Sequence, residues 1–207
     1  MKKLLLTMAL VASAAAVYGQ GTVQFNNGIT ARFQLQRADG VRSNAPGSTS
    51  PQFQALNFGL FWGTTAAEVA LDQTPLTPFG AMTTTPGVMN APGGNGYAVE
   101  TAQPGDRVFL QVRGWSASFG SDWRAAMLAF QANQAGVIFG ETDVRQLGAL
   151  GLGPLGGPGV AIWQGATGTN PNLFNPLILF EAVPEPSVIG LAIIGLGSLV
   201  FLRRRNK

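Results

Sequence analysis

The chain has 207 residues, with 13 Lys and Arg, 10 Asp and Glu, and neither Cys nor His. Without Cys there is no disulfide framework and no thiolate nucleophile, and without His there is no Ser-His-Asp triad and the commonest ligand of catalytic zinc is missing. Charged residues make up only 11% of the chain, which also contains 28 Gly and 13 Pro. This composition is typical of a loop-rich protein that is poor in charge.

The basic residues are not clustered in the sequence as a nucleic-acid-binding surface would require. Six of the 13 lie close to the two ends, at Lys2, Lys3, Arg203, Arg204, Arg205 and Lys207. Between them, residues 20–183 hold seven scattered Arg against nine acidic residues, a net charge of −2. Binding to nucleic acid requires a basic face that neutralises several phosphates, so no nucleic-acid partner is expected.

The first 19 residues have the pattern of a secretory signal peptide. Met1-Lys2-Lys3 is a short positive region, and residues 4–17 form an apolar stretch of the length expected for the central part of such a signal. Small residues permit cleavage after Ala16 or after Gly19. We favour cleavage between Gly19 and Gln20, because the strand-like pattern starts at Thr22.

Period-2 alternation of apolar and polar residues predicts a series of short strands. Residues 22–26 and 31–36 alternate in this way, and Asn26-Asn27-Gly28 between them favours a hairpin turn. Further strands are predicted at residues 56–62, 107–116, 137–139, 160–163 and 177–180. Residues 43–51 and 74–96 are rich in Pro, Gly, Ser, Thr and Asn and are expected to be loops.

One short amphipathic helix interrupts this pattern. Its apolar positions recur at helical spacing, at Trp123, Ala126, Met127 and Phe130. Ser121 or Asp122 is expected to be the N-cap, and Gly136 lies beyond the end. Many short strands with one helix predict a mainly β fold over residues 20–182, an antiparallel β-sandwich of jelly-roll or immunoglobulin-like type.

Two groups of side chains in this domain have a functional interpretation. Glu141 and Asp143 can act as a calcium-binding or glycosidase pair, but acids at this spacing are more typical of a solvated strand face, so no metal, cofactor or catalytic residue is assigned. Trp62 and Trp123 lie on apolar stripes and are assigned to the core. Trp115 and Trp163 are kept as candidate glycan contacts, which can stack on sugars.

Trp115 also has a second interpretation. It shares one face of its strand with Arg113, so it is expected to form either a surface contact or a cation–π pair with that arginine.

The last 25 residues contain three features in a fixed order. Pro184-Glu185-Pro186 comes first, the uncharged apolar run of residues 188–202 follows, and Arg203, Arg204 and Arg205 come last. Fifteen residues make about 22 Å of helix, somewhat less than the ~30 Å hydrocarbon core of a bilayer. The run therefore predicts a short transmembrane helix in contact with lipid, with the three Arg as a basic stop on the cytoplasmic side.

This arrangement resembles the PEP-CTERM sorting signal of Gram-negative bacteria, over residues 183–207. The resemblance implies that Pro184, Glu185 and Pro186 are a sorting motif for an exosortase, a membrane cysteine protease that processes the tail. It also implies export through the inner membrane, a membrane-tethered precursor, and delivery to the cell surface or extracellular matrix. The expected role is structural or interactive and not enzymatic.

Three alternatives remain open at this stage. The protein is a plain tail-anchored envelope protein if the Pro-Glu-Pro triplet is incidental. It is a carbohydrate-binding module, with exopolysaccharide as partner, if aromatic rings are exposed on one sheet face. A carboxylate glycosidase would require two acids about 5–10 Å apart across a cleft.

Overall fold

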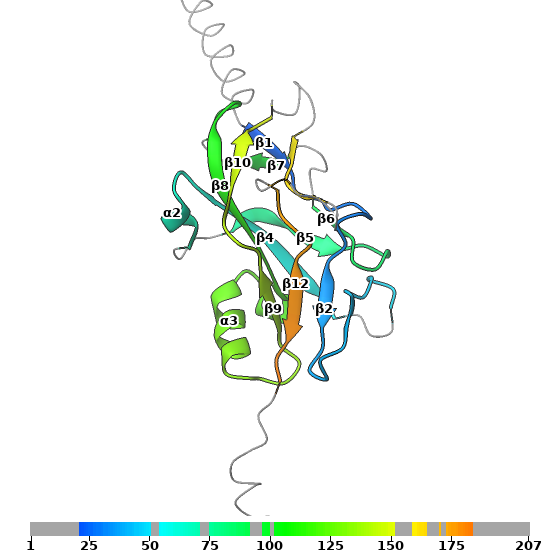
Figure 1. The fold of residues 1–207 in the computed structure, drawn as a ribbon. Helices are drawn as coiled ribbons and strands as arrows, with labels where there is room; N and C mark the ends of the chain where they lie inside the picture. Colours follow the sequence, from blue (N-terminus) through cyan, green and yellow to red (C-terminus); the bar gives the residue numbers. More distant parts are fainter. Residues whose placement is uncertain are drawn as a thin grey trace, which may run out of the picture.

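The computed structural model describes residues 21–50, 54–70, 75–91, 97–99, 102–151, 159–164, 170 and 173–183, and over these residues the protein is mainly β (Figure 1). The strands are β1 (Gly21–Gln24), β2 (Gln34–Gln36), β3 (Arg42–Asn44), β4 (Leu56–Gly63), β5 (Leu76–Met82), β6 (Met89–Asn90), β7 (Tyr97–Val99), β8 (Arg107–Ser116), β9 (Ile138–Glu141), β10 (Arg145–Ala149), β11 (Val160–Ala161) and β12 (Ile178–Glu181). The helices are α2 (Ala66–Ala70), the 3₁₀ helix η1 (Ala117–Phe119) and α3 (Trp123–Gln131).

The described strands form two curled sheets. The smaller has the order β11-β1-β7, and the larger has the order β3-β2-β12-β9-β8-β4-β5-β6, with β10 also paired to β8. Most neighbours are antiparallel, as expected, but β1 with β11 and β2 with β12 are parallel pairs. The longest register joins β4 to β8 through eight residue pairs, from Leu56↔Ser116 to Gly63↔Phe109.

Strand β8 has the bounds predicted from the sequence, and both of its faces are buried. Val108, Leu110 and Val112 face the main hydrophobic cluster, which also contains residues of the smaller sheet. Trp115 on the opposite face belongs to a second cluster. The members of this second cluster are Phe61, Val69, Trp115, Trp123, Ala126 and Phe139, with Phe79, Phe109, Phe119, Met127, Phe130 and Val144 packed against them.

Helix α3 covers this second cluster, and the prediction of an amphipathic helix is confirmed. Trp123 and Ala126 are buried, and the helix packs against β8 and β9 (Figure 1). Of the two expected N-caps, Asp122 has this role, since its carboxylate accepts a hydrogen bond of 2.9 Å from the Ala125 N–H. Gly136 follows the helix with a positive φ of 76°, a conformation that suits glycine.

The hairpin predicted for residues 22–36 is wrong. β1 belongs to the smaller sheet and β2 to the larger one. The reason is Asn27, which is buried instead of exposed at a turn: its amide donates to the carbonyl oxygens of Ala31 at 2.7 Å and Gly87 at 2.8 Å, and its Oδ1 accepts from the Met89 N–H. These bonds tie the segment to a distant part of the chain.

The loops expected at residues 43–51 and 74–96 are also partly wrong. β3 begins at Arg42 and extends to Asn44, and β5 and β6 lie inside the second segment. β6 pairs with β5 at Ala81 and Met82.

Candidate functional site

The predicted sorting residues lie outside the described part of the chain. These are the signal cleavage position Gly19 and Gln20, the motif Pro184, Glu185 and Pro186, the apolar run of residues 188–202, and Arg203, Arg204 and Arg205. Among the described residues, no helix is long and apolar enough to span a membrane.

The described residues nevertheless show where the folded domain ends and the C-terminal tail begins. β12 ends at Glu181, and the next residue, Ala182, is buried and donates a backbone hydrogen bond of 2.8 Å to the Val137 carbonyl. Val183 is exposed. The folded domain therefore holds the chain up to two residues before Pro184.

The structure places Trp115 and Trp163 in the interior, where neither ring can stack on a sugar. Trp115 is fully buried and its Nε1–H donates to the Gly120 carbonyl at 2.9 Å. Trp163 is buried against Phe33 and Phe174, and its Nε1–H donates to the Phe25 carbonyl at 3.1 Å. The expected glycan contacts at these two residues are thus corrected: both rings are core residues with satisfied indole N–H groups.

Arg113 forms its cation–π contacts with other rings than the predicted one. Its guanidinium carbon lies 3.9 Å from the centroid of Trp123 and 4.3 Å from that of Phe61. Trp115 instead stacks edge-on against Phe79. The arginine is thus enclosed by the second hydrophobic cluster, with its side chain only 4% exposed.

The buried charge of Arg113 is compensated by polar partners. Its Nε donates to Glu141 Oε2 at 3.2 Å, and its Nη2 donates to Gln111 Oε1 at 2.7 Å and to the Val69 carbonyl at 3.3 Å. Burial lowers the pKa of the Arg113 guanidinium, and the neighbouring Glu141 carboxylate opposes this effect. This arrangement ties β8 to β9 and α2, and it leaves the guanidinium inaccessible to a large ligand.

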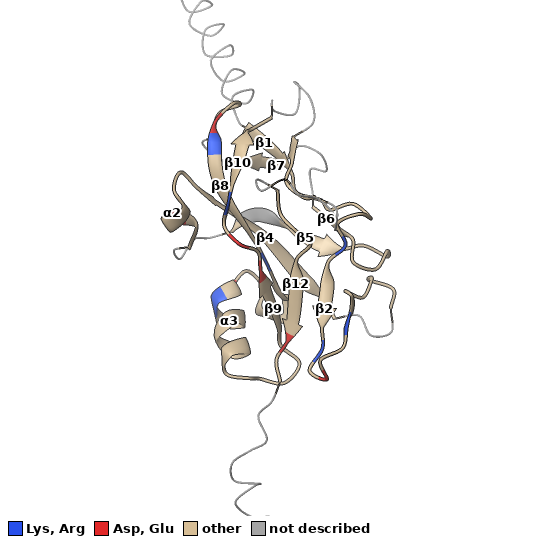
Figure 2. Ribbon diagram, in the orientation of Figure 1, with Lys and Arg blue, Asp and Glu red and all other residues tan. Residues whose placement is uncertain are grey.

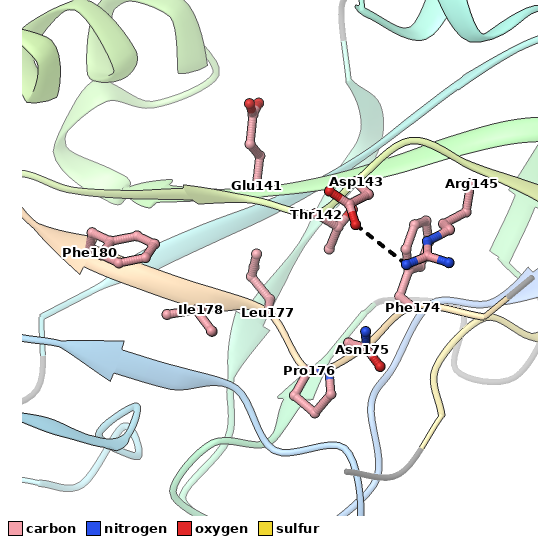
Figure 3. A pocket seen from close by; sticks show the side chains of 10 residues that line it. All are labelled: Glu141, Thr142, Asp143, Arg145, Phe174, Asn175, Pro176, Leu177, Ile178 and Phe180. Carbon is pink, nitrogen blue, oxygen red and sulfur yellow. Dashed lines mark hydrogen bonds and ion pairs between the residues drawn. The ribbon is translucent and has the colours of Figure 1, made fainter. Parts of the chain in front are cut away.

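A surface hollow lies beside this ion pair, where β12 separates from β9. The two strands pair through Phe180↔Phe139 and Glu181↔Ile138. Before that point a hollow of about 210 Å³, open to the surface, lies between β12 and the link from β9 to β10 (Figure 3). Its lining residues are Glu141, Thr142, Asp143, Arg145, Phe174, Asn175, Pro176, Leu177, Ile178 and Phe180.

The two acids of the predicted pair line this hollow, but they do not share a strand face. Glu141 is the last residue of β9, and Asp143 lies in the link to β10, where its Oδ2 accepts from Arg145 Nη2 at 3.4 Å. Each carboxylate thus has an arginine partner, and Figure 2 shows acidic and basic positions close together where β8, β9 and β10 meet. The described residues contain no group of three acidic side chains suited to hold a metal ion.

A second hollow of about 270 Å³ adjoins the first and shares Glu141 and Phe180 with it. Its other lining residues are Met127, Phe130, Gln131, Phe139 and Gly140. Phe180 is 39% exposed. This residue was predicted to lie in a strand and was not named as a candidate site residue. No alternation in the sequence indicated its outward position, because residues 177–180 are all apolar, whereas the structure buries Leu177 and Leu179 and leaves Phe180 exposed.

Comparison with known proteins identifies one region of the chain. The family model described as the PEP-CTERM protein-sorting motif matches residues 182–206. No curated protein and no solved structure matches the chain. The match starts at buried Ala182, directly after the last strand, and includes the Pro-Glu-Pro triplet, the apolar run and the three Arg. The chain therefore carries a PEP-CTERM protein-sorting motif directly after its folded domain.

Proposed function

We propose that the protein is an exported cell-surface or extracellular-matrix protein that an exosortase recognises and processes through residues 182–206. A sorting motif of this family implies export and membrane-associated sorting toward the cell surface. The observation that carries the proposal is the match to this motif, together with its position directly after β12. The folded domain is then the delivered part, with a structural or interaction role.

The remaining targeting elements belong to the same proposal. Residues 1–19 direct export and are removed before Gln20, and residues 188–202 hold the precursor in the lipid bilayer until it is processed. The basic residues Arg203, Arg204 and Arg205 keep the end of the tail on the cytoplasmic side. The support for these roles is the sequence order of positive region, apolar segment, folded domain, apolar segment and basic cluster.

We propose a β-sandwich as the architecture of the delivered domain. Val23 and Tyr97 of the smaller sheet belong to the same hydrophobic cluster as Phe58 and Leu110 of the larger sheet. A shared core between two sheets is the arrangement that defines a sandwich. The two parallel pairs, β1 with β11 and β2 with β12, depart from a purely antiparallel form.

We also propose that the domain is not an enzyme. Three acids that could serve a glycosidase have structural partners: Glu141 pairs with Arg113, Asp143 pairs with Arg145, and Asp122 caps α3. Glu100 lies outside the described residues. Glycosidase assays with substitutions of these four acids test this point, and turnover that any pair of substitutions abolishes would refute it.

Substitution of the motif acid tests the sorting proposal. Glu185→Ala should leave export intact and cause unprocessed protein to accumulate in the membrane fraction. The matched control is Glu181→Ala, which lies outside residues 182–206 and loses only a 3.3 Å bond from the Ala38 N–H. If Glu185→Ala is processed and released like the wild type, a plain tail anchor is the better interpretation.

A carbohydrate-binding module is the second candidate. The buried Trp115 and Trp163 do not support it, but another part of the surface does. The observation that favours it is the hollow beside β12, which combines an exposed aromatic ring with carboxylate and amide groups. The binding of methyl glycosides to the purified chain tests it.

A further inference from the structure

The hollow between β12 and the β9–β10 link has two chemically different sides. Residues of β12 and of the segment that leads into it give an apolar side, formed by Phe174, Pro176, Leu177, Ile178 and Phe180. The opposite side is polar, with Glu141, Thr142, Asp143 and Arg145. Figure 3 shows Phe180 at one end of this row and the Asp143–Arg145 pair at the other. A ligand that fits must therefore present both an apolar face and polar groups.

The hollow is close to electrically neutral. The two carboxylates, Glu141 and Asp143, are balanced by Arg113 and Arg145 at 3.2 Å and 3.4 Å. A cation would compete with an arginine for its carboxylate, and an anion would compete with a carboxylate for its arginine. The charges therefore favour a neutral ligand over either kind of ion.

The polar groups have a defined hydrogen-bonding direction. Gln164 Nε2 donates to Asn175 Oδ1 at 2.8 Å, which leaves the Asn175 amide nitrogen as a donor toward a ligand. The Asp143 carboxylate is 84% exposed and can accept. Thr142 is held in place, because its hydroxyl accepts from the Val112 N–H at 3.0 Å. The hollow thus offers both a donor and acceptors on a supported frame.

We propose that this hollow binds a neutral hexose unit of a polysaccharide. A pyranose ring has hydroxyl groups that both donate and accept, and a C–H face that packs on an aromatic ring, here the exposed face of Phe180. The volume of about 210 Å³ is below the ~300–1,000 Å³ of pockets for drug-sized ligands, which suits a single sugar ring. This inference names the partner of the interaction role proposed above and rests on that role.

Calorimetric titration of the full-length chain tests the proposal. The protein is kept in lauryldimethylamine oxide, because a maltoside detergent would itself present sugar rings. The probes are methyl β-D-glucopyranoside, methyl β-D-galactopyranoside and methyl α-D-mannopyranoside, with glucuronate and glucosamine as charged counterparts. We expect at least one methyl glycoside to bind with a Kd below about 10 mM and more tightly than both charged sugars.

Two substitutions with matched controls locate the binding. Phe180→Ala and Asp143→Asn should each raise the Kd about tenfold or more, the loss expected from an aromatic contact or a charge-assisted hydrogen bond. The controls are Leu128→Ala, an exposed apolar residue outside this hollow, and Asp39→Asn, an exposed acid in the β2–β3 turn. Both controls should stay within about twofold of the wild type.

The proposal is overturned if no methyl glycoside binds below about 10 mM, or if Phe180→Ala and Asp143→Asn bind as tightly as the controls. Either result leaves the sorting proposal intact, because processing at residues 182–206 is measured separately with Glu185→Ala. Conversely, normal processing of Glu185→Ala would refute the exosortase interpretation without changing the sugar titration.

Discussion

Arg113 and Glu141 are direct cross-strand partners of β8 and β9, with Nε and Oε2 3.2 Å apart. The arginine side chain is 4% exposed and the glutamate side chain 48% exposed. One member of the pair is therefore in the hydrophobic interior and the other at the surface. The Glu141 carboxylate thus pairs from the surface with a buried guanidinium, which lies over the rings of Phe61 and Trp123.

Removal of the Glu141 charge should destabilise the fold. Glu141→Gln leaves the Arg113 guanidinium buried without its counter-charge, and because the carboxylate is half exposed we expect a loss of about 1–2 kcal/mol in the free energy of unfolding. Urea denaturation measures this loss. Asp143→Asn is the control, because it weakens an exposed pair and should cost less than about 0.5 kcal/mol. Equal losses in the two variants would contradict the burial argument.

Gly140 is expected to be intolerant of a side chain. A Cβ at this position of β9 would collide with the Ile178 carbonyl oxygen and lie 3.0 Å from the Leu179 Cα, both in β12. Because the obstacle is backbone, Gly140→Ala should cost about 2 kcal/mol or more. Gly148→Ala in β10 is the matched control, since nothing lies within 4 Å of its Cβ. Thermal unfolding compares them, and the prediction is wrong if their Tm values agree.

The stability of the α2 region should depend on pH through Glu68. Its carboxylate accepts from the Thr64 hydroxyl at 2.7 Å and from the Thr64 and Thr65 N–H groups, and these bonds lower the pKa of Glu68 below its usual 4.5. A lowered pKa stabilises the fold above pH 4.5, and this contribution is lost as the pH falls through the folded-state value.

The test compares the wild type with Glu68→Gln in urea unfolding at several pH values. The wild type should be more stable near neutral pH, and the difference should shrink as the pH falls below 4.5. A difference that stays constant down to pH 2 would show that the charge of Glu68 has no part in it.

A fragment of residues 20–183 should fold as a soluble β domain, because it keeps every described strand. A shorter fragment of residues 20–176 lacks the buried Leu177 and the whole of β12, which lies between β2 and β9 and contains the buried Leu179. Its large sheet would be divided, so it should not unfold cooperatively. Far-UV circular dichroism and urea titration distinguish the two fragments. A helix-dominated spectrum for the longer fragment would refute the fold.

Local patterns predicted those elements that alternation or helical spacing defines within a single segment. β8 was predicted with its observed bounds, and α3 from the spacing of Trp123 to Phe130. Alternation did not reveal that β8 is buried on both faces, because the second cluster depends on α3 folding back over the strand. The cation–π contact of Arg113 with Trp123, the first residue of α3, was missed for the same reason.

The residues of the hollow were predictable only in part. Glu141 and Asp143 stood out as acids two residues apart, but the hollow also needs Asn175 and Phe180, more than 30 residues later in the sequence. Nothing in either segment alone indicates that they meet. Their proximity follows from the pairing of β12 with β9, a contact that is set by the whole sheet.

The parallel pairing of β2 with β12 joins Gln34 to Ile178, two residues that are 144 positions apart in the sequence. We expect a contact between such distant segments to form late in folding, because a large loop must close before the contact adds any stability. For a chain exported N-terminus first, the nine-stranded sheet cannot be completed until residues 178–181 have emerged. By then only residues from 182 onward remain behind, so completion of the fold would coincide with the arrival of the sorting motif at the membrane.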